Sequence, residues 1–478
     1  MRDTTYHYGN CLAAATTVKI TPPNDIYHRM WGAALHERAE GVHQPLECNV
    51  LWLRARDGSG ELLMLSVDHC LFWKDATDAL KQTVSAACGV QLEAIVVYFT
   101  HTHGAGLMDL GRSALPGGEL IGPYLEEIGS KIAEACHTLA GSLKGAWLCA
   151  GTGDCSLATN RDYFDVDRNG YVCGFNPLSQ ADTTLLVIRV SNLEGDLVAV
   201  LSNYACHPTT LAWDNKLISP DYVGAMRKTM RHAIGKVPVV FVQGASGDVG
   251  PREGYVGDVK VAERNGRQLG LSNLSVLAGM PEKPARYSYD GAVISGATIG
   301  VWSYKDFNSS DLEDLAGFTQ ERHEVLLGYR DDLGTVDSVN TRIAELESLS
   351  ESGETQGWTE VERRDHRALL EREHRKLTRI SKLESIESFT YTIRSWSIGE
   401  IVLLGLNGEL YNCYQTRVRE AVGDRAVVVG TLADGSDCWY LLDHASYGKG
   451  LYQEDASVIQ QGGLEVLIDA TVKLLNLG

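Results

Sequence analysis

The chain has 478 residues, of which 44% are hydrophobic and 22% are charged, a composition typical of a globular protein with a large core. Its formal net charge of -19 repels phosphate backbones and anionic lipid, which argues against nucleic-acid binding and against attraction to an anionic bilayer. No stretch approaches the roughly 18 apolar residues of a membrane-spanning helix, so we expect no membrane span.

The cysteines indicate a reducing compartment. There are 11 of them, an odd number, and no two form a CxxC pair. This pattern fits a reduced protein better than a disulfide framework. The N-terminal residues carry an acid at Asp3 and only a short apolar run, so they do not resemble a signal peptide. We therefore expect a cytoplasmic location.

Short runs rich in Val, Ile and Leu alternate with longer amphipathic stretches along the chain. The short runs predict strands at Val50–Arg54, Leu62–Val67, Ile95–Phe99, Leu185–Val190, Leu197–Tyr204, Val237–Gln243, Phe389–Trp396 and Ile401–Leu406. The amphipathic stretches predict helices at Ala76–Ala87, Pro123–Leu139, Pro220–Ile234 and Val259–Leu277. This alternation indicates an α/β fold of mixed β-sheets flanked by helices, which we expect to form a single domain over residues 1–478.

Residues 310–387 differ from the rest of the chain. They are charged and poor in Gly and Pro, and Leu and Ile recur at helical spacing between Glu, Arg and Lys. This pattern predicts an inserted helical hairpin. A solvated excursion, a lid and a subunit contact are all compatible with it. We expect a homo-oligomer that depends on this hairpin.

Polar motifs follow several of the apolar runs and bring His101 with His103, His207 and Glu409. Loops at the carboxyl ends of strands converge in α/β sheets, so one shared site is the economical interpretation. Imidazole and carboxylate groups are good zinc ligands. In an extended segment, His101 and His103 would point the same way. Each motif alone is equally compatible with an ordinary core or surface histidine, or with a glutamate at a helix start.

Seven motifs together resemble the catalytic N-terminal domain of the neutral/alkaline ceramidase family, in the family's order. They are VKITPP, THTHGAG, ATNRDYF, CHPTTL, GASGDVGP, LNGEL and WYLLDHASYGKGLYQ. The resemblance implies the family's catalytic-domain fold and a zinc-dependent hydrolase that cleaves an amide bond of a small or lipid-like N-acyl substrate. An esterase or lactonase of the same fold, and a catalytically inactive binding protein, are the alternatives.

The resemblance also implies which residues hold the zinc ion. Carried over motif by motif, the ligands are His101, His207, Glu409 and Tyr440. The motif around Tyr440 departs from the family pattern, because no threonine follows it at the family's position. Tyr440 is therefore also compatible with a buried aromatic side chain.

Further pocket residues follow from the same motifs. His103 matches a histidine beside the metal, Arg161 an arginine that binds a substrate oxygen, and Tyr452 a second pocket tyrosine. Arg161 is equally compatible with a structural ion pair. Gly32 resembles a glycine that leaves room for substrate, and Asp68 is a candidate for orienting a ligand.

The chain departs from the family at Gly250, where the family has a serine that takes part in catalysis. Without that hydroxyl, we expect a metal-activated water to attack the substrate directly. His103 is the first candidate for the general base, and Asp248 is the second. Asp248 is equally compatible with a carboxylate that caps a loop.

Overall fold

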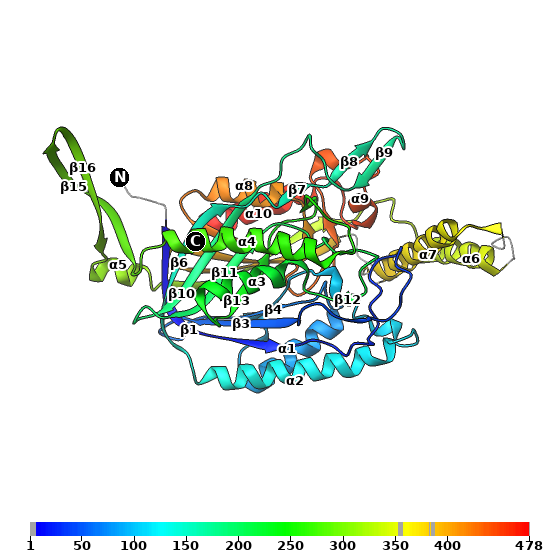
Figure 1. The fold of residues 1–478 in the computed structure, drawn as a ribbon, viewed down its shortest axis with the longest axis horizontal. Coiled ribbons are helices and arrows are strands. Elements are labelled where there is room, and N and C mark those ends of the chain that lie inside the picture. Colours follow the sequence, from blue (N-terminus) through cyan, green and yellow to red (C-terminus); the bar gives the residue numbers. More distant parts are fainter. Residues whose placement is uncertain (1–5, 352–356, 382, 384–387, 478) are drawn as a thin grey trace.

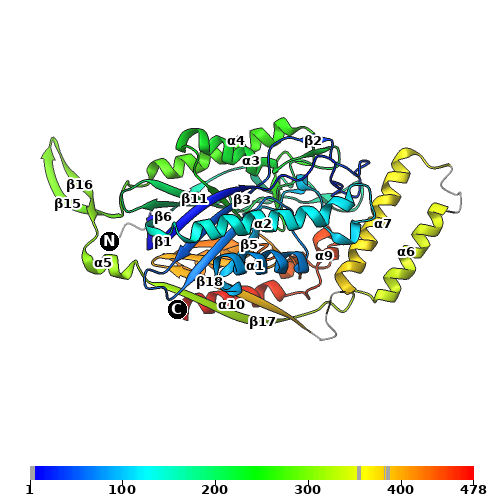
Figure 2. The same cartoon turned by 90° about the horizontal axis from the view of Figure 1, so that it is seen from below.

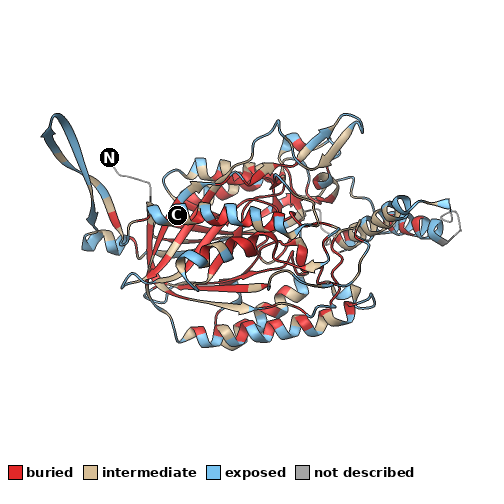
Figure 3. Cartoon of the chain, viewed as in Figure 1, coloured by how far each residue is buried: buried red, intermediate tan, exposed pale blue. Residues whose placement is uncertain are grey.

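The protein, seen here as a computed structural model, is built from two β-sheets packed face to face, with helices on their outer faces (Figure 1). The structure describes residues 6–351, 357–381, 383 and 388–477. This arrangement confirms the predicted α/β class of mixed sheets flanked by helices. Figure 3 shows that the strands of the two sheets form the most buried part of the molecule.

The larger sheet has eight strands in the order β13-β11-β10-β6-β1-β3-β4-β5. Most neighbours are antiparallel, whereas β4 with β5 and β11 with β13 are parallel pairs. The strands are β1 (Tyr6–Lys19), β3 (Glu47–Arg54), β4 (Glu61–Val67), β5 (Ile95–Phe99), β6 (Lys144–Asp154), β10 (Thr184–Asn192), β11 (Leu197–Tyr204) and β13 (Val239–Gln243). The six strands predicted in this part of the chain are confirmed.

The smaller sheet has four strands in the order β17-β18-β19-β21. They are β17 (Phe318–Gly328), β18 (Ser388–Ile398), β19 (Ile401–Leu406) and β21 (Ala426–Gly430). Its inner face shares one hydrophobic core with the larger sheet, which includes Trp396 and Leu403 on one side and Val96 on the other. Tyr98 donates a hydrogen bond across the interface to the Leu404 carbonyl at 3.0 Å. The predicted strands β18 and β19 are confirmed.

Helices cover the outer faces of both sheets (Figure 2). Four of them, α1 (Lys74–Cys88), α2 (Ile121–Ala140), α3 (Asp221–Ile234) and α4 (Val259–Gly279), pack on the larger sheet and match the four predicted helices. On the smaller sheet lie α8 (Cys413–Val422) and α10 (Gly463–Leu477). Each helix buries one apolar stripe and leaves a polar face in water, as the amphipathic pattern requires.

The predicted hairpin over residues 310–387 is shorter than expected. Its first part is wrong, because Phe318–Gly328 forms β17, and only the short α5 (Ser309–Asp314) precedes it as a helix. The pairing of β17 with β18 explains the difference, because an edge strand tolerates charged residues, and most of the TQERHE segment is exposed. The hairpin itself is formed by α6 (Val336–Glu351) and α7 (Glu360–Ser381), and residues 352–356 and 384–387 lie outside the described residues.

Two further features bear on the expectations from composition. Among the described residues, no helix is both long and apolar enough to cross a bilayer. All 11 cysteines lie in the described part of the chain, and each is a free thiol. A two-stranded hairpin of β15 (Ala285–Ser295) and β16 (Ala297–Asp306) projects from the body at the end opposite α6 and α7 (Figure 1).

Candidate metal centre and its pocket

Three of the predicted ligands are brought together where strands of both sheets end. His101 follows β5 and His207 follows β11 in the larger sheet, whereas Glu409 follows β19 in the smaller sheet. All three side chains are buried. Glu409 Oε2 lies 3.3 Å from His101 Nε2 and 3.8 Å from His207 Nε2, and the three candidate ligand atoms lie within 4.8 Å of one another.

His101 and His207 are each oriented by a hydrogen bond from Nδ1, the ring nitrogen that faces away from Glu409. His101 Nδ1 donates a hydrogen bond to the Cys70 carbonyl at 2.8 Å, and His207 Nδ1 donates one to the Ser246 carbonyl at 3.4 Å. Because a carbonyl oxygen only accepts, both Nδ1 atoms carry hydrogen, so Nε2 is the nitrogen of each ring that is left to face Glu409. A metal-binding histidine is typically held in this way.

The cluster fits a divalent metal ion. His101 Nε2 and Glu409 Oε2 are buried and have no hydrogen-bond partner among the described residues, although they face each other. Burial alone would raise the pKa of Glu409, but the neighbouring His101 lowers this pKa below its usual value. Two imidazole nitrogens and one carboxylate oxygen form a donor set that zinc prefers.

Tyr440 lies beside this cluster. Its short strand β22 (Tyr440–Leu441) pairs with β20 (Glu409–Leu410), so that Tyr440 is directly opposite Glu409. Arg161 donates through Nη2 to the Tyr440 hydroxyl at 3.2 Å and to the Gly247 carbonyl at 2.7 Å. Arg161 is itself buried, and its Nε and Nη2 atoms donate to the protein. The structure therefore shows Arg161 holding Tyr440 in place, and its contact with a substrate stays a prediction.

The expected geometry of His101 and His103 is wrong, although both face the same cavity. Strand β5 ends at Phe99, His101 has a left-handed backbone with a φ of 66°, and His103 begins a short 3-10 turn (His103–Ala105). The alternation of side chains along a strand therefore does not apply to them. A positive φ is unusual for a residue other than glycine and is maintained here by buried surroundings.

His103 is in contact with the candidate ligands. Its Nε2 lies 3.2 Å from His207 Nε2, and its ring packs against Trp31 with 5.0 Å between ring centroids. Burial and the charges of the neighbouring His101 and Arg161 lower the pKa of His103 well below its usual value. The imidazole of His103 is therefore neutral at neutral pH and keeps a lone pair on one ring nitrogen, although the lowered pKa makes it a weaker base.

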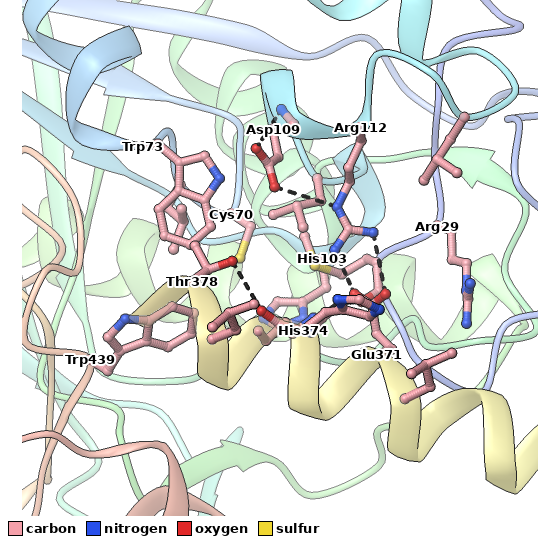
Figure 4. Close-up of a pocket in the computed structure, with 18 of the residues that line it drawn as sticks. Arg29, Cys70, Trp73, His103, Asp109, Arg112, Glu371, His374, Thr378 and Trp439 are labelled. Atoms are coloured by element: carbon pink, nitrogen blue, oxygen red, sulfur yellow. Dashed lines mark hydrogen bonds and ion pairs between the residues drawn. The ribbon is translucent and has the colours of Figure 1, made fainter. Parts of the chain in front are cut away.

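A cavity of about 830 Å³ opens beside these residues (Figure 4). His101, His103, Glu409 and Tyr440 line it, and the half-exposed Tyr452 lies at its edge. Helix α7 forms one wall and contributes the side chains of Arg367, Leu370, Glu371, His374, Arg375, Leu377 and Thr378. Its volume lies within the range of small-molecule sites. The inserted hairpin thus belongs to the pocket.

The room predicted for substrate at Gly32 is occupied by the protein. A Cβ added to Gly32 would lie 3.1 Å from the Cβ of Ala368 and 3.2 Å from its Cα. The missing side chain therefore allows α7 to approach, which corrects the expected role of Gly32. At Gly250, an added Cβ would lie 3.6 Å from Thr209 Oγ1, an ordinary contact, so this position has space for a small side chain.

Two further carboxylates have structural partners. Asp248 Oδ1 accepts from the backbone N–H of Asn412 at 2.6 Å, and its Oδ2 accepts from Asn160 Nδ2 at 3.3 Å. It is absent from the described cavity lining, which favours the loop-capping alternative over a general base. Asp68 forms a buried ion pair with Arg227 and accepts from Thr100, so it supports the segment that precedes His101.

A substitution at Asp248 is expected to change how stability depends on pH. Burial raises the pKa of Asp248 to about 7. A carboxyl group whose pKa is higher in the folded state than in the unfolded state stabilises the fold fully only below its unfolded pKa of about 4. This stabilisation is lost as pH rises through the folded pKa. The free energy of unfolding of Asp248→Asn, relative to that of the parent protein, should therefore increase by about 2 kcal/mol between roughly pH 5.5 and pH 8. Urea unfolding at both pH values measures it, and an equal effect at both would contradict the assignment.

Several pocket residues were missed from the sequence. Cys70, Trp73 and Trp439 line the cavity, Trp31 packs on His103, and Arg375 of α7 lines the cavity from the hairpin. Trp31 and Trp439 each adjoin a residue that the motifs single out, Gly32 and Tyr440, which was an available signal. Nothing local in the sequence indicates that α7 folds back over the site, because that depends on tertiary contacts.

Comparison with known proteins gives one sequence relative and a shared fold. No family model matches the chain. Neutral ceramidase B of Dictyostelium discoideum is 28% identical over 281 residues, which cover 54% of this chain and 38% of that protein. The chain thus matches well under half the length of this relative.

Two solved structures share the fold. The neutral ceramidase of Pseudomonas aeruginosa matches with a TM-score of 0.63 and 16% identity, over 99% of this chain and 75% of that chain. A structure described as ceramidase complexed with C2 matches with a TM-score of 0.64 and 15% identity over the same shares of the two chains. At this level of identity the likeness establishes the common fold.

Proposed function

This chain belongs to the neutral ceramidase-like family, and from that premise we propose that it is a zinc-dependent hydrolase of amide bonds in ceramide-like N-acyl substrates. One observation carries the proposal. His101, His207 and Glu409 come from three separate strand ends, yet their buried ligand atoms converge within 4.8 Å beside a cavity. Buried polar atoms that lack a hydrogen-bond partner, as His101 Nε2 and Glu409 Oε2 do among the described residues, are costly unless they serve a ligand.

The protein's own residues suggest a division of roles. His101, His207 and Glu409, with Tyr440 opposite the glutamate, would hold the zinc ion. When bound, the ion would act as a Lewis acid, which lowers the pKa of water to near neutrality and polarises a carbonyl group. The neutral His103 lies at the edge of this cluster and would take the proton from the attacking water.

Tyr440 and Arg161 lie on the side of the site that Glu409 occupies. The hydrogen bond from Arg161 fixes the Tyr440 hydroxyl next to Glu409, so Arg161 acts as a positioning residue. Tyr452, whose ring centroid lies 5.9 Å from that of Tyr440, would contact the substrate at the edge of the cavity. With glycine at position 250, no side-chain hydroxyl is available there as a nucleophile.

Metal removal tests the proposed function. We expect the purified protein to release free amine from N-acyl amines, including ceramide with a short acyl chain. A chelator should abolish this activity, and one equivalent of zinc should restore it, because the site depends on the ion for its chemistry. Amine release measured by chromatography gives the result. Activity that survives complete metal removal, or cleavage of matched esters alone, would contradict an amidase that depends on zinc.

We further propose a cytoplasmic homo-oligomer that forms through the α6–α7 hairpin. Val361 and Leu369 of α7 are 54% and 47% exposed, so they are available to a second copy. Replacing both by aspartate is expected to convert the oligomer to a monomer, since buried carboxylates without partners oppose association. Light scattering measures the mass, with Leu271→Asp on α4 as the exposed control. A parent protein that is already monomeric would contradict this proposal.

A further inference from the structure

The cavity beside the candidate metal centre has two chemically different ends. Trp73 and Trp439, whose ring centroids are 5.9 Å apart, form its tryptophan end. Its arginine end is formed by Arg29, Arg112, Arg367 and Arg375. Figure 4 shows the two tryptophans on one side, Arg29 and Arg112 on the other, and His103 between them. A substrate held across His103 would thus place an apolar part and a polar part in different surroundings.

The arginine end carries more positive than negative charge. Four arginines line the cavity, against three carboxylates outside the candidate ligand set, which are Glu37, Asp109 and Glu371. Each glutamate is shared between two guanidinium groups. Glu37 contacts Arg29 and Arg367, and Glu371 contacts Arg112 and Arg375. In a chain with a net charge of -19, this local excess attracts anions to one place.

The Nε donors of Arg29 and Arg112 form no hydrogen bond with the described residues. The side chain of Arg29 is only 8% exposed, and its Nε has no hydrogen-bond partner among the described residues. Arg112 Nε, in a side chain that is 12% exposed, has no hydrogen-bond partner there either, and its nearest charged neighbour is Asp109 Oδ2 at 3.6 Å. A buried donor without a hydrogen-bond partner costs free energy, so Arg29 Nε, in a residue that lines the cavity, indicates a ligand with acceptor atoms.

Helix α7 supplies half of the arginine end and is held firmly against the body. Arg375 donates through Nε to Glu371 at 2.8 Å and through Nη2 to the Met30 carbonyl at 2.5 Å. Arg112 donates to Glu371 at 2.6 Å, and Ala368 packs directly on Gly32. The arginine end is therefore a built surface with fixed side chains.

We propose that the substrate of this site is an N-acyl compound whose amine portion carries an anionic group, such as a carboxylate. Its acyl chain lies at the tryptophan end, and its anion is bound at the arginine end through guanidinium forks. This inference rests on the proposed function for the amide bond, but the recognition of the anion is independent of cleavage. The α6–α7 hairpin thereby forms the wall of the pocket that favours anionic over neutral substrates.

Binding to the metal-free protein tests the inference without hydrolysis. N-hexanoylglycine and its neutral amide, N-hexanoylglycinamide, differ only in the charged group. Calorimetry should show that the anion binds at least about tenfold more tightly than the amide, as expected for charge-assisted hydrogen bonds. Equal affinities for the two compounds would overturn the proposal. If the anion binds selectively but the zinc-loaded protein cleaves neither compound, the proposed function fails and the inference stands.

Variants identify the residues responsible. Arg29→Gln and Arg375→Gln should each reduce the preference for the anion by about tenfold while leaving affinity for the amide nearly unchanged. Arg29→Lys, which keeps the charge but loses the fork, should retain part of the preference. The matched control is Arg372→Gln, because Arg372 lies on the same helix but pairs with Asp455 outside the cavity lining. A loss of affinity for both compounds alike in both glutamine variants would show that these arginines only hold α7, and would overturn the proposal.

Discussion

Replacing His207 by alanine is expected to leave the purified protein with almost no zinc. His207 Nε2 is one of three buried ligand atoms that converge within 4.8 Å, and its ring is oriented by the bond from Nδ1 to the Ser246 carbonyl. Loss of a residue that merely orients a ligand costs about 10- to 100-fold in metal affinity, so loss of a ligand should cost at least about 100-fold. Elemental analysis after dialysis against buffered zinc measures the effect.

The control for this experiment is His232→Ala. His232 is an exposed histidine on α3, so its loss changes the histidine count without touching the cluster. The control should retain about one zinc ion per chain, as the parent protein should. Near-stoichiometric zinc in His207→Ala would rule out the assigned ligand set, and the group of Cys70, His101 and His103, whose ligand atoms also lie within 4.8 Å, would then be the next candidate.

Replacing His103 by alanine is expected to lower turnover by about 100- to 10,000-fold while zinc remains bound, as for loss of a general base. The burial of His103 and its neighbouring charges keep the imidazole neutral, so one ring nitrogen retains its lone pair. Because its Nε2 lies 3.2 Å from His207 Nε2, His103 is close enough to the candidate ligands to exchange a proton with a water molecule beside them. Steady-state kinetics combined with elemental analysis separates loss of chemistry from loss of metal.

Two outcomes would contradict this role. Loss of zinc in His103→Ala would make His103 a ligand instead of a base. An acyl adduct, detected by intact mass after acid quenching of a substrate that is being turned over, would show that a side-chain hydroxyl attacks first. Ser246 is the hydroxyl to examine, although it is buried and its Oγ accepts a 2.6 Å hydrogen bond from Gln243 Nε2. We expect no adduct.

The strands and helices of the body could be predicted from the sequence because each has a clear apolar pattern. All eight expected strands and all four expected helices are present, with boundaries that differ by a few residues. The segment of β17 was misassigned for an identifiable reason. As an edge strand it leaves charged side chains in water, so its composition resembles that of a solvated helix more than that of a buried strand.

The site could be predicted only as a set of residues. The shared position of His101, His207 and Glu409 at strand ends follows from the rule that loops converge there. The backbone of His101, which departs from the strand at a φ of 66°, could not be anticipated from alternation. The role of Gly32 was misjudged because its neighbour Ala368 is more than three hundred positions away in the chain, and only the folded structure brings them together.

The division of the candidate ligands between two sheets determines when the chain could acquire its ion. His101 and His207 follow strands of the larger sheet, whereas Glu409 and Tyr440 follow strands in the last quarter of the sequence. During synthesis, the first two are made long before the last two leave the ribosome. A nascent chain would therefore offer an incomplete coordination shell, and metal uptake would be among the final steps of maturation.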